Sequence, residues 1–577
     1  MSIATAAQIP VSLPQTKDER RLRIGVIVDS LLQPLWAIRV LEGIESAQFI
    51  DLVLIIRMER QQLDSGSSAL RLRSKVLDLW FRADERIFRS RCAQPDAFRP
   101  TAFMPSCTRP KMLAWPSQEA SASVRQGVVD QIRDAEVDIL LQLSTAASAM
   151  QLFDLARFGV WSFPTSERAT TDVFWTVYRK KPVLENDVEV QQAGHQRIIC
   201  ASYLASDPVS LFRNHTNLYW KRADALLRCL SELRDSGLQG VEEHAQKPLD
   251  LRPPPRSSDV LRLTPRVVTR ALGQQMTKQL ARERWFVAFR KIIDTDEVAG
   301  RTSFTLLWPP DGRFYADPFI CEHGGKTYIF FEDYSYAQGK AVISFVELSA
   351  EGSCSEPQLA LEEDFHLAYP SLFQFNGELF LLPETKNRRT VQVYRATAFP
   401  RGWELAHILL ADVEAADSTL FHHDGKFWLF TSGVGTADPW FDADSELSLF
   451  VASSLEGPWV AHPRNPVVAD VRRSRCAGQL FFLGKHLVRP SQDCSKCYGH
   501  SVVLNRIDTL SETEYREVPV GRIAPDWMPG NLGTHTYNHS KNYEVLDGRT
   551  LSARYRLRGR PAKIQTLPAS TQVLSPF

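Results

Sequence analysis

The stretch that decides the fold of the second half of the chain is YADPFI at residues 315–320, with HGGK at 323–326 and YIFFED at 328–333. It sets a short polar signature, an apolar strand, a turn and a second apolar strand in direct succession. Aromatic and β-branched strands around a glycine turn are a strong local signal for a β-hairpin. The stretch therefore predicts a hairpin whose apolar faces need neighbouring sheets to cover them.

The same pattern recurs further along the chain. YPSLF at 369–373 precedes an Asn-Gly turn and the strand LFLLPE, and DSTLF at 417–421 precedes an Asp-Gly turn and the strand FWLF. Looser copies begin at residues 475 and 533. A period of roughly 50 residues is typical of propeller blades, and a closed ring leaves no long exposed strand edges. We therefore predict an all-β five-bladed propeller over residues 300–570.

A propeller brings distant residues together at its axis, because the innermost strand of each blade lines the central channel. Asp317, Ser371, Asp417 and His535 each stand at the start of an expected innermost strand. These four side chains should therefore converge at one mouth of the channel, although they are far apart in the sequence.

The first half of the chain shows a different pattern. Apolar stretches typical of buried parallel strands occur at residues 22–30, 50–57, 137–143 and 158–163. An amphipathic helix is expected between the first two, and strand, helix and strand in this order indicate a right-handed βαβ unit. We predict a Rossmann-like α/β domain over residues 21–240, preceded by a disordered tail over residues 1–20.

Two segments connect the predicted domains. Residues 241–262 are rich in proline and charge, which is typical of a linker. Residues 263–295 carry apolar side chains at helical spacing and predict a connecting helix that packs the propeller against the first domain. A membrane-surface helix is the alternative, because basic residues are spread along this segment. They are Arg266, Arg270, Lys278, Arg282, Arg284, Arg290 and Lys291.

Composition narrows the function. The 577 residues include 23% charged and 44% hydrophobic ones, which indicates a globular chain. The net charge of +1 gives no reason to expect a nucleic-acid partner. No apolar run approaches the ~18 residues of a membrane span, and residues 1–20 lack the apolar core of an export signal, so a cytoplasmic location is expected. The sequence leaves the oligomeric state open.

No cofactor or metal is expected from the cysteines. The chain has nine of them, scattered without a disulfide framework. One CxxC motif, at residues 494–497, has no second pair to complete a zinc site.

In the first domain, the segments IGVIVDS, VDILLQLS, ARFGVWSFPTSE and DVFWTVYRKKPV together resemble the formyltransferase fold of methionyl-tRNA and nucleotide-sugar formyltransferases. The resemblance implies an Asn and a His two residues apart, and the matching positions hold Ser162 and Pro164. Pro164 has no titratable group for proton transfer, and Ser162 lacks the amide that would steady an oxyanion. The resemblance therefore implies a formyltransferase-type scaffold that has lost its chemistry, or a related sugar-binding module.

In the second half, FYADPFI, YPSLF and DSTLF resemble the five-bladed propeller glycoside hydrolases of the arabinanase, β-xylosidase and arabinofuranosidase type. Such enzymes use a pair of carboxyl groups, one as acid and one as base or nucleophile. The resemblance implies that Asp317 is the base or nucleophile and that Asp417 tunes the acid.

The sequence motifs identify the general acid less clearly than the base. Glu384 ends an apolar inner strand pair and is favoured over Glu456, which follows the third unit and suggests an outer strand. Glu332 and Asp333 close the equivalent strand of the first unit and could also reach the mouth.

A longer resemblance covers residues 300–550. ADPF with FFED, YPSLF with LLPET, DSTLF with DGKFWLF, RCAGQLF with RPSQDCSKCYG, and GTHTYN resemble, in this order, the N-terminal propeller of plant glucosamine inositolphosphorylceramide transferases. They also resemble bacterial proteins that join such a propeller to a formyltransferase-like domain. In the plant proteins another domain performs the transfer, so the resemblance implies a carbohydrate or glycolipid context without naming a reaction.

Three functions remain under consideration. The first is a carbohydrate-active protein with glycoside hydrolase or transglycosidase chemistry, in which Asp317 is base or nucleophile and Glu384 or Asp417 is the acid. The second is a non-catalytic carbohydrate-binding protein that serves surface polysaccharide or glycolipid biosynthesis. The third, a sugar N-formyltransferase, is disfavoured by Ser162 and Pro164. The candidate substrate-binding residues are His535, Arg489, Gln492, Asp493, Arg475 and Tyr315.

Overall fold

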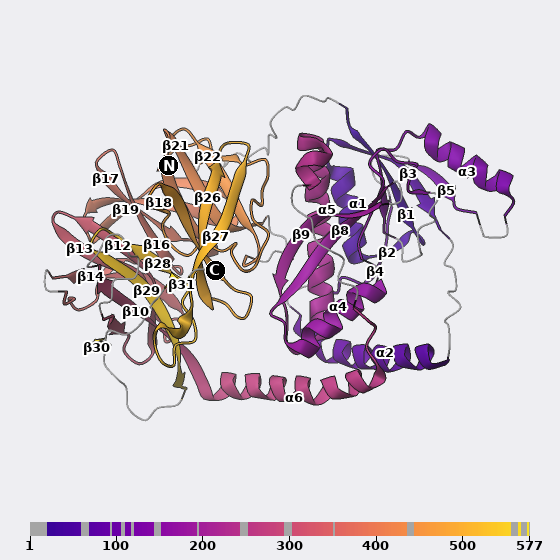
Figure 1. The fold of residues 1–577 in the computed structure, drawn as a ribbon. Helices are drawn as coiled ribbons and strands as arrows, with labels where there is room; N and C mark the ends of the chain where they lie inside the picture. Colours follow the sequence, from indigo (N-terminus) through magenta and orange to yellow (C-terminus); the bar gives the residue numbers. More distant parts are fainter. Residues whose placement is uncertain are drawn as a thin grey trace. The chain divides into compact units, whose positions relative to one another are not determined.

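The computed structural model divides the chain into two compact units, residues 15–272 and 273–577 (Figure 1). It describes residues 20–58, 68–92, 95–104, 110–116, 120–143, 152–164, 166–192, 195–242, 252–292, 303–349, 352–435, 443–554, 563–566 and 574–575. Most of the predicted tail and residues 243–251 of the predicted linker lie outside these ranges.

The first unit is built on one mixed sheet of seven strands. Its order is β5 (Lys111–Ala114), β3 (Ile50–Arg57), β1 (Leu22–Val28), β6 (Ile139–Gln142), β7 (Val160–Ser162), β8 (Val183–Gln192) and β9 (His195–Ala205). The first five strands pair in parallel, and β8 and β9 are antiparallel. Strand β1 is buried along nearly its whole length, as expected of a parallel strand covered on both faces.

Helices accompany this sheet, so the prediction of an α/β domain is confirmed. They are α1 (Leu35–Ser46), α2 (Ser68–Phe88), α3 (Ala122–Asp134), α4 (Ser166–Arg179) and α5 (Leu211–Glu242). A small two-stranded sheet pairs β2 (Leu32–Pro34) with β4 (Pro100–Ala102).

The second unit contains five sheets of four or five strands, which confirms the predicted five-bladed propeller (Figure 1). Blade 1 is β12 (Arg313–His323), β13 (Lys326–Ser335), β14 (Lys340–Leu348) and β15 (Gln358–Leu361). Blade 2 is β16 (Ala368–Phe375), β17 (Glu378–Glu384), β18 (Thr390–Ala398) and β19 (Gly402–Ala411). Blade 3 is β20 (Glu414–His423), β21 (Lys426–Gly435), β22 (Leu447–Ala452) and β23 (Val460–Ala461).

The remaining two sheets have five strands each. Blade 4 is β24 (Phe481–Leu483), β25 (His486–Asp493), β26 (Ser501–Leu510), β27 (Tyr515–Ile523) and β31 (Leu574–Ser575). Blade 5 is β28 (Tyr537–His539), β29 (Tyr543–Ala553), β10 (Ala281–Lys291), β11 (Thr305–Trp308) and β30 (Lys563–Thr566).

Blade 5 closes the ring with strands from both ends of the unit. Strand β10 pairs antiparallel with β29 along its entire length, from Ala281 opposite Ala553 to Lys291 opposite Tyr543. The helical prediction over residues 263–295 is therefore wrong for Ala281–Lys291, because helix α6 (Ser257–Leu280) ends where β10 begins. Residues 285–290 are buried in succession, so an apolar run that suits a helix face also suits a strand covered on both sides.

A buried ion pair links these two closing strands. Arg290 of β10 stands opposite Glu544 of β29, and their side chains, each 2% exposed, are in direct contact. The Tyr537 hydroxyl donates a further hydrogen bond to Glu544 at 3.1 Å. Burial raises the pKa of Glu544, although Arg290 opposes this. The carboxylate therefore depends on its arginine to remain charged inside the sheet.

We expect Arg290→Met to destabilise the propeller by about 3–5 kcal/mol, because it leaves a buried carboxyl group without its cation. Denaturant unfolding of the full chain, followed through the propeller transition, measures the effect. Arg395→Met is the matched control, since Arg395 pairs with Glu404 on the exposed surface and should matter little. Equal losses in the two variants would refute a special role for the buried pair.

Candidate functional site

Three blades share an unusual backbone conformation where their inner strands begin. Asp317, Tyr369 and Asp417 have φ values of 51°, 46° and 49°, in the left-handed region that non-glycine residues rarely adopt. In each case the register with the second strand of the blade shifts at this point. The position predicted for Ser371 in blade 2 is therefore occupied by Tyr369. Its hydroxyl accepts a hydrogen bond from the Gly478 N–H in blade 4 at 2.6 Å.

Asp317 is held by hydrogen bonds from two other blades. Its Oδ1 accepts from the Thr536 hydroxyl at 2.7 Å, and its Oδ2 accepts from the Tyr369 N–H at 3.3 Å. The Asp317 N–H donates to Asp547 Oδ2 at 3.2 Å. The carboxylate is thus buried at the meeting point of blades 1, 2 and 5.

His535 lies between two acidic side chains. Its Nδ1 contacts the Asp547 carboxylate, and its Nε2 is 3.6 Å from Asp317 Oδ1. The Trp285 ring of β10 stacks on the imidazole at a centroid distance of 4.0 Å. Burial lowers the pKa of His535, but Asp547 and Asp317 outweigh this and raise it above its ordinary value. The imidazole is therefore favoured in its charged form.

Within the part of the chain that the structure describes, the same three residues form a group that could hold a metal ion. Asp317, His535 and Asp547 offer ligand atoms within 4.8 Å of one another. Carboxylate oxygen and imidazole nitrogen together suit several divalent ions. A cation at this point would compete with the His535 proton, because imidazole binds a metal ion in its neutral form.

Asp417 has a separate set of partners. Arg475 Nε donates to its Oδ2 at 2.6 Å, and the Gln492 amide donates to the same oxygen at 2.9 Å. The Asp417 N–H donates to Glu384 Oε2 at 3.2 Å. Arg475 also reaches Asp444 at 2.8 Å, so a single guanidinium balances several carboxylates.

Glu332 on β13 and Glu384 on β17 occupy equivalent places in their blades. Each stands opposite the alanine that precedes the left-handed residue of the inner strand. Burial raises the pKa of Glu332 well above its usual range, and the negative charges of Asp317, Glu384 and Asp417 add to the effect. Burial likewise raises the pKa of Asp317 and of Asp417 to about 6.

We call this set of side chains the mouth cluster. Its members are Asp317, Glu332, Glu384, Asp417, Arg475, Gln492, His535 and Asp547. The structure thus gathers six of the nine predicted site residues: Asp317, Asp417, Glu384, His535, Arg475 and Gln492.

The other three predicted site residues are engaged elsewhere. Arg489 is fully buried and makes two hydrogen bonds to Glu517, at 2.9 and 2.8 Å. Asp493 pairs with Arg522. Tyr315 belongs to an apolar core between blades 1 and 5.

The predicted site did not include Tyr369, Asp547 or Trp285, and Glu332 was named only as a side chain that could also reach the mouth. Placing DPF, YPS and DST in one column would have put Tyr369 beside Asp317 and Asp417. Asp547 and Gly548 have the sequence of an Asp-Gly turn, but the structure places both within β29. Trp285 carries no signal of its own, because its segment was predicted to be helical.

Comparison with known proteins finds a family similar to this propeller. Residues 308–554 match the family model described as glucosamine inositolphosphorylceramide transferase 1, N-terminal. This part of the chain is therefore similar to that N-terminal region, as the sequence motifs predicted.

Particular relatives are plant proteins. Glucosamine inositolphosphorylceramide transferase 1 of Oryza sativa subsp. japonica is 35% identical over 262 residues, which cover 43% of this chain and 34% of the relative. The Arabidopsis thaliana protein of the same name is 35% identical over 231 residues, 39% of this chain and 29% of the relative. The chain thus spans about a third of the length of the curated relatives that it matches.

Solved structures that align with part of the chain include carbohydrate enzymes. An exo-β-1,3-galactanase from Clostridium thermocellum aligns with a TM-score of 0.31 at 10% identity, over 40% of this chain and 59% of that one. A family 117 glycoside hydrolase from Zobellia galactanivorans aligns with a TM-score of 0.29 at 14% identity, over 46% of this chain and 90% of that one. Among the helices that the structure describes, none is both long and apolar enough to cross a bilayer.

The charge of His535 depends on Asp547, and this dependence can be measured. We expect Asp547→Asn to lower the pKa of His535 by about one unit or more, because it removes the carboxylate nearest to the imidazolium. A histidine NMR titration of the wild type and the variant gives the two values. Asp508→Asn, on the exposed surface beside Arg506, is the control. An unchanged His535 pKa in Asp547→Asn would show that this pair does not set the protonation of the site.

Proposed function

We propose that the mouth cluster binds a glycan or a glycolipid head group and carries out glycoside hydrolase or transglycosidase chemistry on it. The observation that carries this proposal is the convergence of five carboxyl groups from four blades, three of them with raised pKa values. Glycoside cleavage needs one protonated and one ionised carboxyl group on opposite sides of the scissile bond. Environments that separate the pKa values of neighbouring carboxyl groups provide both forms at one pH.

In this proposal Glu332 is the acid and Asp317 is the base. Burial and neighbouring negative charge favour the protonated form of Glu332, and its side chain is 8% exposed. Glu332 gives its proton to the glycosidic oxygen while the bond from that oxygen to the anomeric carbon breaks. Asp317 takes the proton of the water or acceptor hydroxyl that attacks this carbon. A base whose pKa lies near 6 accepts a proton more readily than an ordinary aspartate.

Glu384, Asp417 and Arg475 are proposed to position the sugar. The Glu384 and Arg475 side chains are each 13% exposed, so they can reach hydroxyl groups that enter the mouth. Asp417 is more deeply buried and orients Arg475 through their hydrogen bond. The curated relatives are named glucosamine inositolphosphorylceramide transferases, which supports glycolipid or surface polysaccharide biosynthesis as the context.

A second function, carbohydrate binding without turnover, is supported by the saturation of the two buried aspartates. Thr536 and Tyr369 donate to Asp317, while Arg475 and Gln492 donate to Asp417. If these contacts persist in the complex, Asp317 and Asp417 only hold their neighbours in place. The more exposed side chains of the mouth cluster, Glu384 and Arg475, then make the contacts with the sugar.

A glycan array and an aryl-glycoside panel, applied to wild type and variants, separate the two functions. We expect Glu332→Gln to lower turnover about 10²-fold or more while sugar binding changes little. Asp317→Asn should act similarly. Glu322→Gln, on the exposed end of β12 in the same blade, should leave both unchanged.

The pH dependence follows from the acid. Because Glu332 must carry a proton, turnover should fall as the pH rises through its pKa, and Glu332→Gln should lose this alkaline limb. Sugar binding without turnover in the wild type would reject the enzyme and support the second function. Absence of sugar binding would reject both.

For the α/β unit we propose a formyltransferase-like scaffold that does not transfer formyl groups. The five parallel strands with an appended antiparallel pair support the scaffold. Ser162 ends β7, and Pro164 lines a cavity of about 60 Å³ beside Arg222 and Asp187. With a formyl-folate donor and an amino-sugar nucleotide we expect no formylated product by mass spectrometry. Product formation above a protein-free blank would overturn this.

A further inference from the structure

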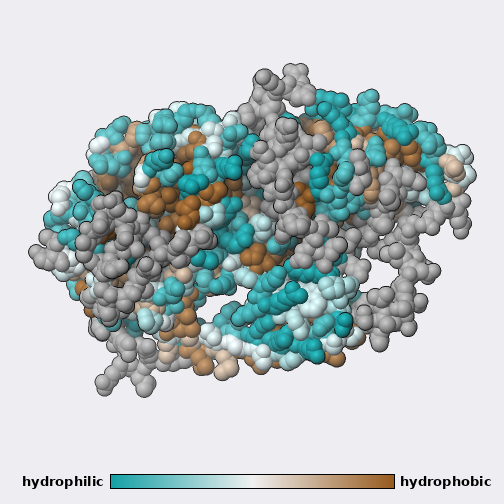
Figure 2. Space-filling model, in the orientation of Figure 1, coloured by the Kyte–Doolittle hydropathy of each residue, from teal (hydrophilic) through white to brown (hydrophobic). Residues whose placement is uncertain are grey.

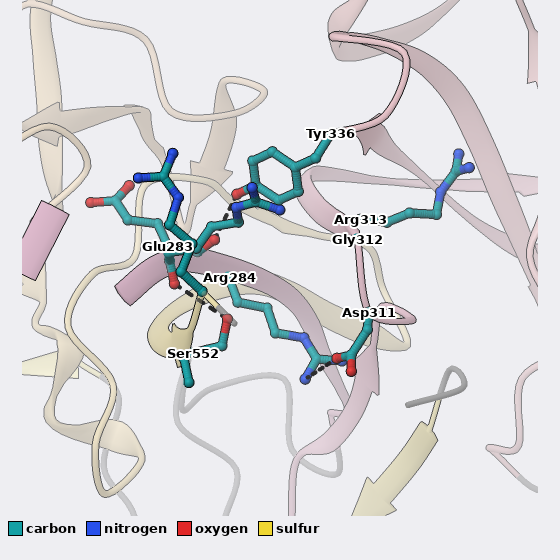
Figure 3. Close-up of a pocket in the computed structure, with 10 residues that line it drawn as sticks. Glu283, Arg284, Asp311, Gly312, Arg313, Tyr336 and Ser552 are labelled. Atoms are coloured by element: carbon teal, nitrogen blue, oxygen red, sulfur yellow. Dashed lines mark hydrogen bonds and ion pairs between the residues drawn. The ribbon is translucent and has the colours of Figure 1, made fainter. Parts of the chain in front are cut away.

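A basic cleft lies where β10 begins, at the edge of blade 5 next to blade 1. Figure 3 shows Arg284 and Asp311 on one side of it and Tyr336 on another. Its volume is about 170 Å³, which is room for several water molecules. Arg282 and Arg554 also line it. The cleft can therefore hold a group of the size of a phosphate beside guanidinium side chains.

The acidic residues that line the cleft neutralise only some of its arginine side chains. Arg284 lies 3.8 Å from the Asp311 carboxylate, and Glu283 pairs with Arg549 at 3.0 Å. The Arg282 guanidinium instead stacks over the Tyr336 ring at 4.0 Å. In the part of the chain that the structure describes, no carboxylate lies within ion-pair distance of Arg282.

Arg554 directly follows β29 and lies against the last residues of α6. Its Nη1 donates to the Lys278 carbonyl at 3.0 Å, and its N–H donates to the Leu280 carbonyl at 2.9 Å. No acidic partner of Arg554 occurs among the described residues. Among the described residues the cleft thus carries two guanidinium groups without acidic partners, a combination suited to phosphate.

Exposed apolar side chains directly precede, in the sequence, the first residue that lines this cleft, Arg282. Met276 and Leu280, on the last turns of α6, are 58% and 61% exposed. They are four residues apart and so lie on one face of the helix. Figure 2 shows apolar atoms along the lower edge, where α6 runs in Figure 1. Exposed apolar side chains next to cationic ones are typical of segments that lie at a membrane surface.

We propose that this surface, defined by Met276, Lys278, Leu280, Arg282 and Arg554, binds anionic phospholipid at a membrane surface. The lipid phosphate would occupy the cleft between Arg282 and Arg554, while Met276 and Leu280 enter the boundary between head groups and acyl chains. Soluble phosphate would use the arginines alone, so the exposed apolar pair selects the lipid as the source. This inference does not depend on the chemistry proposed for the mouth cluster.

Flotation of the full-length protein with vesicles provides the test. One set contains phosphatidylcholine alone and the other contains phosphatidylcholine mixed with phosphatidylserine. We expect binding to the mixed vesicles only, weakened by added salt. Arg282→Gln and Arg554→Gln should each reduce binding about fivefold, the loss expected for one basic side chain near an anionic surface. Met276→Ser with Leu280→Ser should reduce it as well.

Arg395→Gln and Leu405→Ser, exposed on blade 2, are the matched controls and should bind as the wild type does. Circular dichroism confirms the fold of each variant. Thermal stabilisation by inorganic phosphate provides a second readout for the arginines, independent of vesicles. Failure of the wild type to float with phosphatidylserine vesicles overturns the proposal, even where phosphate stabilises it. Equal flotation of Arg282→Gln, Arg554→Gln and the controls overturns it too.

Discussion

The pairing of β10 with β29 is the constraint on which the propeller and its mouth depend. It joins residues more than 250 positions apart and completes blade 5. The same two strands supply Trp285, which stacks on the His535 ring, and Asp547, which contacts its Nδ1. Blade 5 then holds blade 1, because Thr536 donates to Asp317 and Asn538 donates to the Pro318 carbonyl at 2.8 Å. Ring closure and assembly of the mouth are thus one event.

Closure gathers like charges in a buried place, which raises the free energy of the folded state. Burial and mutual repulsion raise the pKa values of Asp317, Glu332 and Asp417. Arg475 and the charged form of His535 offset part of this cost by direct contact. Left-handed backbone at Asp317 and Asp417 adds strain of about 1–3 kcal/mol per residue. Strain and like charges that coincide at one place indicate a functional site more than a structural one.

The sequence predicts the blades because each is a local hairpin with its own turn signal. It does not predict β10, since the apolar run at Trp285–Phe289 suits a buried strand and a helix face equally well. Its partner strand β29 lies more than 250 residues later, so no local sequence pattern indicates the pairing. The direction of a polar side chain is also hidden: Gln492 reaches Asp417, whereas Arg489, three residues earlier on β25, turns to Glu517. Alternation along a strand fixes opposite faces, but only the packed blades decide which face meets the channel.

The two proposed sites share β10. Arg282 lines the basic cleft and Trp285 contacts the mouth cluster, so three residues, roughly 10 Å of extended strand, separate them along the chain. Their charges are opposite, because carboxylates dominate the mouth and guanidinium groups dominate the cleft. An acidic mouth repels phosphate and favours neutral or amino sugars, whereas the cleft favours phosphate. A glycolipid combines the two chemistries in one molecule, so the two proposals taken together assign its sugar and its phosphate to separate points along one strand.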